Sequence, residues 1–120
     1  MSAQPPRYDF LSAPAEPLSI EVFRDRDAVR LRPVGTLDLA TEPQLEERLT
    51  ELRAAGFREL IVDLRGLVFM DSTGLRLILR WDAAARADGF TIGFVPGSPE
   101  IQRVFELTGT SEHASFVDPD

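Results

Sequence analysis

A short apolar run in the middle of the chain constrains the fold most. Leu60-Ile61-Val62-Asp63-Leu64 is nearly continuous in apolar side chains, and such runs are typical of central strands that are covered on both faces. Helical patterns stand before and after this run. We therefore expect a layered α/β domain with helices packed on a sheet.

The chain before this run predicts a hairpin. Residues 18–22 and 29–31 alternate apolar with polar side chains on either side of a turn at Asp25-Arg26-Asp27, which is the pattern of two neighbouring strands. Pro33 predicts that the end of the second strand lies at an edge or a bulge, because proline cannot donate a ladder hydrogen bond.

A first helix is predicted between this hairpin and the central strand. Thr41 is a good N-cap, and Gln44 three residues later completes a capping box. Gly56 is a natural stop. The helix carries one apolar stripe on an otherwise charged surface, made of Leu45, Leu49 and Leu52.

The second half of the chain predicts two more helices and two strands. We expect a loop over residues 65–71, a helix from about Thr73 to Asp88 that ends at Gly89, and a strand from Thr91 to Val95. Ser98 and Pro99 open a third helix, which ends at Gly109, and residues 115–117 form a last short strand.

The predicted order is therefore β-β-α-β-α-β-α-β. Helical connections favour parallel strands and the hairpin adds an antiparallel pair, so the central sheet is mixed. We expect one domain over residues 18–120. The proline-rich residues 1–17 are expected to form a flexible tail.

Composition excludes several classes of function. The net charge is −7, which argues against direct binding of nucleic acid. All 13 basic residues are arginine, so lysine chemistry is excluded. His113 is the one histidine and cysteine is absent, so a metal site is not expected. Neither a secretory signal nor an apolar run of the roughly 20 residues that cross a bilayer is present, and we expect a cytoplasmic protein without membrane insertion.

The stretch that joins the expected loop to the second helix is the most informative about function. Ser72 lies where an N-cap would stand, and the start of a helix presents unpaired N–H groups and a positive dipole end, which suit a phosphate. The same residues are also ordinary capping sequence. Local chemistry leaves both interpretations open, and Thr73 is an alternative or second site.

Three stretches together point to a known family. Residues 35–41, Gly-Thr-Leu-Asp-Leu-Ala-Thr, contain G-x-L-D after the second strand. Residues 69–75, Phe-Met-Asp-Ser-Thr-Gly-Leu, match F-x-D-S-[ST]-G-L. Pro99 to Gly109 supplies a late helix that ends Phe-Glu-Leu-Thr-Gly. In this order and at this spacing, from Leu18 to Val117, they resemble the STAS domain family, named for sulfate transporters and anti-sigma factor antagonists.

The resemblance implies a STAS-like fold and a partner-switching regulator that is not an enzyme and needs no cofactor. Ser72 would be the phosphorylation site. The unphosphorylated domain would bind an anti-sigma factor with GHKL-type serine kinase activity, which frees the sigma factor for transcription. Phosphorylation would block binding, and a PP2C-type phosphatase would reset the switch. The partner-binding residues expected on this basis are Asp38, Phe69, Met70, Asp71, Ser72, Thr73, Gly74, Leu75 and Arg76.

Several neighbouring residues allow two interpretations. We expect Asp38 and Asp71 to approach the loop together, since each follows a strand. Val68 is expected in the core, whereas Phe69 and Met70 fit either the core or an exposed patch. Trp81 is expected to pack against its own sheet, with an interface anchor as the alternative. Arg76 and Arg80 lie one turn apart on the predicted helix. We expect both side chains to face solvent, and contact with an acidic partner is the alternative.

The same residues argue against a hydrolase but leave a second regulatory role open. A hydrolase elbow would need glycine where Met70 stands, and one distal histidine leaves no Ser-His-Asp triad. An accessory role in a membrane transporter or a larger signalling assembly stays open. The family usually adds a helix after its last strand, so the element it would cover is expected to be exposed or covered by the tail or a second copy. We expect a monomer or weak dimer.

Overall fold

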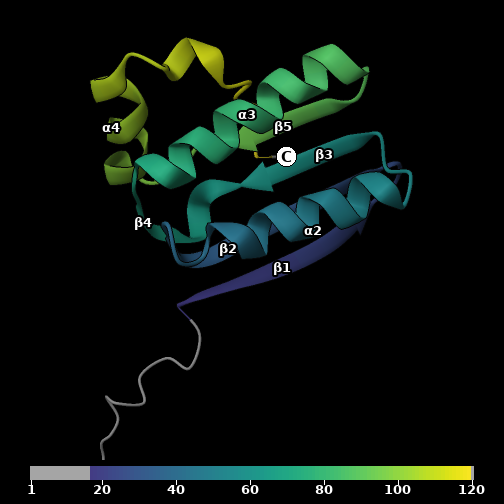
Figure 1. Cartoon of the computed structure of the whole chain (residues 1–120), viewed down its shortest axis with the longest axis horizontal. Coiled ribbons are helices and arrows are strands. Elements are labelled where there is room, and N and C mark those ends of the chain that lie inside the picture. The colour runs from purple at the N-terminus through teal and green to yellow at the C-terminus, as the bar shows by residue number, and fades with distance from the viewer. Residues whose placement is uncertain (1–16, 120) are drawn as a thin grey trace, which may run out of the picture.

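A five-stranded mixed sheet carries the fold of this protein, whose computed structural model describes residues 17–119 (Figure 1). The strands are β1 (Leu18–Asp25), β2 (Ala28–Leu37), β3 (Glu59–Asp63), β4 (Leu67–Met70) and β5 (Thr91–Val95). The helices are α2 (Glu42–Ala54), α3 (Ser72–Asp88) and α4 (Pro99–Thr108), with short 3₁₀ turns η1 (Leu64–Gly66) and η2 (Ser111–His113). The predicted α/β class and mixed sheet are confirmed. Of the predicted tail, only Pro17 lies within the described residues.

β1 and β2 form the predicted hairpin. Asp25 pairs with Ala28, so the turn consists of Arg26 and Asp27. Arg26 adopts a φ of 60°, as the first central residue of a tight hairpin turn does when it follows the twist of its strands. A tight two-residue turn therefore joins the two strands.

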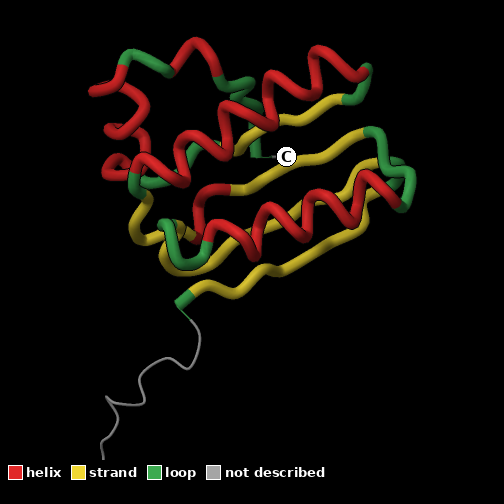
Figure 2. The backbone as a smooth tube through the Cα atoms, in the orientation of Figure 1, coloured by secondary structure: helices red, strands yellow, loops and turns green. Residues whose placement is uncertain are grey.

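β2 has two partners in succession on its other side. Its first half pairs in parallel with β3, from Ala28 opposite Glu59 to Leu31 opposite Val62. Its last residues pair with β4, where Leu37 lies opposite Met70. Figure 2 shows the turn of η1 that separates β3 from β4. The prediction of a loop over residues 65–71 is wrong for β4, because four successive apolar residues carry no alternation that distinguishes a strand.

Pro33 lies in the interval between these two partners. Leu31 is the last residue of β2 opposite β3, and Gly35 is the first opposite β4. Of the two predicted alternatives, an edge or a bulge, the structure shows a bulge-like shift of register, which lies between Gly35 and Thr36. Gly35 has a φ of 120°, and a Cβ there would lie 2.2 Å from the carbonyl oxygen of Pro17. Glycine is therefore required where the chain enters the sheet.

α2 and α3 lie side by side across one face of the sheet, and α4 packs near β4 (Figure 1). Leu45 and Leu49 of the predicted stripe are buried, and Leu52 packs partly buried against the core. α3 and α4 end at Gly89 and Gly109, as predicted.

The start of α2 differs from its prediction. Thr41 is the N-cap residue, but its side chain makes no cap hydrogen bond. Its hydroxyl instead donates to the Thr36 carbonyl over 2.7 Å. The Gln44 amide donates to the Leu18 carbonyl, 3.3 Å away, rather than back to the cap. The predicted capping box is therefore wrong, because both side chains are used to tie α2 to the strands.

The chain end crosses the sheet face that α2 and α3 leave uncovered. Phe116 forms a single parallel bridge with Phe94, so the predicted strand over 115–117 is reduced to one residue. The Val117 side chain packs directly on Gly93, because a Cβ on Gly93 would lie 2.8 Å from Val117 Cγ1. Further on, the Pro119 carbonyl accepts a hydrogen bond from Arg30 of β2 over 2.8 Å.

Candidate functional site

The ends of β2 and β4 bring the two predicted acidic residues to one place. Leu37 and Met70 are paired, and the Asp71 N–H donates to the Leu37 carbonyl over 3.2 Å. Asp38 and Asp71 each follow directly, so they stand at the same end of the sheet, as expected. The Asp38 carboxylate accepts from the N–H groups of Ala40, at 3.0 Å, and Thr41, at 3.2 Å. These hydrogen bonds stabilise the turn between β2 and α2.

Asp71, not Ser72, caps α3. The Asp71 carboxylate accepts from the Thr73 N–H at 2.9 Å and the Gly74 N–H at 3.2 Å. Ser72 is the first residue of the helix, its side chain is exposed, and its hydroxyl makes no hydrogen bond to residues 17–119. The prediction of Ser72 as cap is wrong. Because another side chain does the capping, the Ser72 hydroxyl is left accessible for modification.

Three of the expected partner-binding residues lie beneath the loop rather than on its surface. Met70, Gly74 and Leu75 are buried. A Cβ on Gly74 would lie 2.8 Å from Met70 Cγ and 2.9 Å from Leu37 Cγ. The glycine thus allows the first turn of α3 to pack directly against the paired ends of β2 and β4.

Exposed apolar side chains lie on the strand and the turn that lead to the serine loop. Val68 is 74% exposed and Phe69 53% exposed, although both belong to β4. Leu39, in the turn after β2, is 73% exposed. We call these three residues the apolar rim. The prediction that Val68 packs in the core is wrong, since within β4 it is Leu67 and Met70 that are buried. Leu39 was not among the expected contact residues, although an apolar side chain within a turn is a detectable signal.

The polar side chains near the start of α3 differ in exposure and in the ion pairs that they make. Thr73 is half-buried, whereas Arg76 is exposed and makes no ion pair within the described part of the chain. Arg80 instead binds Glu46 at 2.9 Å and Glu42 at 3.2 Å on α2, and these hydrogen bonds raise the pKa of Arg80. The Arg80 guanidinium is therefore already paired with carboxylates of α2.

Trp81 is also part of the packing between α2 and α3. It is half-buried, and its indole N–H donates to Glu46 over 2.9 Å. Its ring meets Phe90 edge-on, with 6.1 Å between the ring centroids. Trp81 therefore packs within its own domain, but against α2 and the residue before β5 rather than, as was expected, on the strands of the sheet.

A buried carboxylate holds the joint that leads into β4. Asp63 is fully buried at the end of β3 and accepts from the Arg65 N–H at 3.1 Å and from the Arg65 guanidinium at 2.9 and 2.8 Å. Arg32 lies 3.3 Å and Arg30 3.6 Å from the same carboxylate. Burial raises the pKa of Asp63, but the hydrogen bonds and charge of Arg65 and the charge of Arg32 outweigh it and lower the pKa to about 2.

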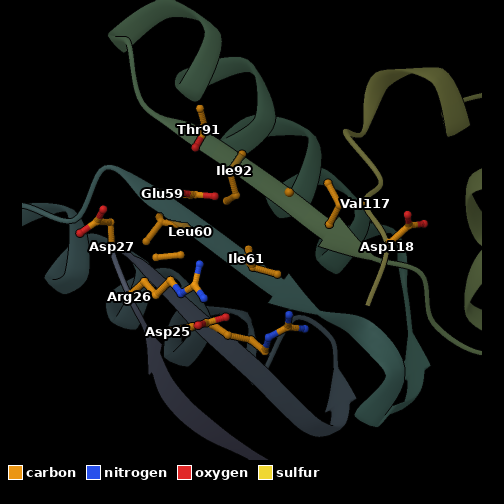
Figure 3. A pocket seen from close by; sticks show the side chains of 13 residues that line it. Asp25, Arg26, Asp27, Glu59, Leu60, Ile61, Thr91, Ile92, Val117 and Asp118 are labelled. Carbon is orange, nitrogen blue, oxygen red and sulfur yellow. The ribbon is translucent and has the colours of Figure 1, made fainter. Parts of the chain in front are cut away.

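A hollow lies at the opposite end of the sheet from Ser72. It is a groove of about 780 Å³, shown in Figure 3 between the turn at Asp25–Asp27, the starts of β3 and β5, and Val117. It shares no residue with the serine loop. Among the residues described, no group of His, Asp or Glu side chains is placed to hold a metal ion, and no helix is long and apolar enough to span a membrane.

Relatives of known name share both sequence and fold with this chain. The anti-sigma-B factor antagonist of Staphylococcus aureus is 35% identical over 95 residues, covering 79% of this chain and 88% of the relative. The crystal structure of an anti-sigma factor antagonist from Mycobacterium paratuberculosis superposes with a TM-score of 0.71 at 24% identity, covering 86% of each chain. The unphosphorylated form of the anti-sigma factor antagonist SpoIIAA gives 0.69 at 23% identity, covering 85% of this chain and 89% of that one.

These names describe regulators of another protein rather than enzymes, which agrees with the prediction from the sequence. The family model described as "STAS domain" matches residues 19–118, which is nearly all of the described chain. The protein therefore belongs to the STAS domain family.

Proposed function

We propose that this protein is an anti-sigma factor antagonist whose affinity for its partner is switched by phosphorylation of Ser72. In the unphosphorylated form it binds an anti-sigma factor with GHKL-type serine kinase activity and thereby frees a sigma factor. Phosphorylation releases the partner, and a PP2C-type phosphatase restores the binding form.

One observation carries the proposal: an accessible serine stands beside exposed apolar surface. Ser72 is exposed, and the apolar rim of Leu39, Val68 and Phe69 lies on the turn and the strand that end beside it. Apolar side chains of this size exposed near one another commonly mark a protein-binding surface. A modification of Ser72 therefore changes the charge of such a surface directly.

The electrostatics of the loop give the switch its direction. A phosphate adds about −1.5 to −2 charge, and Asp38 and Asp71 already stand at the ends of the paired strands. Adding a dianion to a surface that must lose its water on binding costs several kcal/mol, which is a change in affinity of about a hundredfold or more.

The fold itself is compatible with such a switch. Asp71 caps α3 through its own carboxylate, so modification of Ser72 leaves the helix start intact. SpoIIAA has been solved in phosphorylated as well as unphosphorylated form, and the phosphorylated form superposes on this chain with a TM-score of 0.64 at 23% identity. The contact surface, rather than the fold, is what we expect to change.

The test is a pull-down from host lysate followed by measured affinities. Wild type, Ser72→Ala and Ser72→Asp serve as baits, and Ser111→Asp is the matched control because Ser111 is also exposed but lies in η2. We expect an anti-sigma factor to be retained by wild type, Ser72→Ala and Ser111→Asp and lost with Ser72→Asp. Dissociation constants for the purified partner with and without phosphate on Ser72 then give the size of the switch.

Two outcomes would contradict the proposal. Near-equal affinity of the phosphorylated and unphosphorylated forms would show that Ser72 is not a switch. Recovery of the same transporter or scaffold subunits by every bait would favour the accessory role that the sequence left open.

A further inference from the structure

We propose that Arg76 is the counter-ion of a phosphate on Ser72, so that phosphorylation also withdraws this arginine from the partner surface. The inference rests on the proposed function, because it concerns the phosphorylated state of the same serine. It assigns the switch two parts, an added anion and a sequestered cation.

Most of the backbone donors at the start of α3 are already occupied. A phosphate at a helix N-terminus ordinarily binds the unpaired N–H groups of the first turn. Here the Asp71 carboxylate accepts from the N–H groups of Thr73 and Gly74 at 2.9 and 3.2 Å. The Leu75 N–H donates to the Asp71 carbonyl at 3.1 Å. A phosphate on Ser72 can therefore reach at most the N–H of Ser72 itself at the helix start, and a side-chain cation is what remains to neutralise it.

Helix geometry places Arg76 over Ser72. Both residues belong to α3, four positions apart, and residues at i and i+4 have Cβ atoms about 5–6 Å apart. Side chains of a helix lean toward its N-terminus, so an arginine leans over the residue four positions before it. Both side chains are exposed, which leaves room for the phosphate between them.

Arg76 is also the arginine that is free to respond. Within residues 17–119 it makes no ion pair or hydrogen bond through its side chain. Arg80, one turn further along α3, is held by Glu46 at 2.9 Å and Glu42 at 3.2 Å. A phosphate on Ser72 thus meets an unpaired guanidinium one turn away, and the next one along the helix is neutralised.

The acidic side chains near Ser72 oppose a phosphate, so an arginine is needed to offset them. The carboxylates of Asp71, which precedes it, and of Asp38, at the end of the paired strand, both repel a phosphate. The guanidinium of Arg76 can donate two parallel N–H bonds to phosphate oxygens, which is the strongest arrangement for such a pair. In the unphosphorylated protein the same guanidinium faces solvent and is available to a carboxylate of the partner.

The experiment measures the second pKa of phosphoserine by ³¹P NMR titration. Phosphoserine is installed genetically at position 72 of the full chain, so no kinase is required. Wild type is compared with Arg76→Gln, and with Arg103→Gln as a matched control, because Arg103 is an exposed arginine on a different helix. We expect the second pKa in wild type and Arg103→Gln to lie about half a unit below that in Arg76→Gln, since a nearby cation favours the dianion. Equal values in all three proteins would overturn the inference.

A binding measurement separates this inference from the proposed function. Arg76→Gln should weaken the unphosphorylated complex with the retained anti-sigma factor about fivefold, whereas Arg103→Gln should not. If phosphorylation abolishes binding but the phosphate pKa is the same with and without Arg76, the pairing is refuted and the proposed function stands. If the pKa differs but phosphorylation leaves affinity unchanged, the proposed function fails and the pairing stands.

Discussion

Replacing Asp63 by asparagine tests the joint that leads into β4. The carboxylate is fully buried and its pKa falls from 3.8 to about 2 in the folded protein. At about 1.36 kcal/mol for each pKa unit, this difference corresponds to about 2 kcal/mol of stability at neutral pH. Because Arg65 and Arg32 keep part of their side chains in solvent, they can turn toward water when the carboxylate is lost. Arg30, whose side chain is only 15% exposed, loses its ion pair as well, so the cost of Asp63→Asn should be at least about 2 kcal/mol.

Urea unfolding at a series of pH values gives the decisive comparison. A depressed pKa in the folded state contributes stability above the unfolded pKa of 3.8, and this stability is lost as pH falls through about 2. The difference in unfolding free energy between wild type and Asp63→Asn should therefore be constant from about pH 7 to 5 and shrink by about 1 kcal/mol at pH 3. Asp118→Asn, at an exposed carboxylate, is the control and should show no such trend. A difference that stays the same down to pH 3 would refute the assignment of Asp63 as the anion of this cluster.

Three further substitutions test the loop itself. Gly74→Ala should lower the free energy of unfolding by about 1–3 kcal/mol because its Cβ would lie 2.8 Å from Met70 Cγ; urea unfolding checks this, and an unchanged midpoint would contradict the close contact. Phe69→Ser should leave stability within about 0.5 kcal/mol, as its side chain is over half exposed, but weaken anti-sigma factor binding about tenfold by calorimetry; unaltered affinity would remove Phe69 from the interface. Asp71→Ala should cost about 1 kcal/mol through loss of the cap to Thr73, a loss that Asp71→Asn should largely avoid in the same thermal melts.

The parts of the fold that were predictable are those set by neighbours in the chain. The apolar run at Leu60–Leu64 and the stops at Gly89 and Gly109 are local signals, and the structure confirms them. β4 was missed because its identity depends on pairing with β2 and not on any pattern within residues 67–70. The capping box at the start of α2 failed for a related reason, since the side chains that would form it are bound to distant parts of the sheet.

The candidate site was predictable in its position but not in its details. Asp38 and Asp71 were expected together because each follows a strand, and the pairing of β2 with β4 places them so. Whether Asp71 or Ser72 caps α3 could not be decided from sequence, because both residue types are good caps. The exposure of Val68 depends on what covers β4, which is a property of the assembled layers.

The divided partnership of β2 also bears on the order in which the molecule assembles. β1 meets β2 through a two-residue turn, whereas Leu37 meets Met70 only after α2, β3 and η1 have been placed between them. Closing a long loop costs more chain entropy than closing a hairpin, so non-local pairs form later. Pulse-labelling hydrogen exchange should accordingly protect the amides of β1 and β2 before those of β4. A chain still folding would then lack the surface around Ser72, so under the proposed function only fully folded molecules would bind the anti-sigma factor.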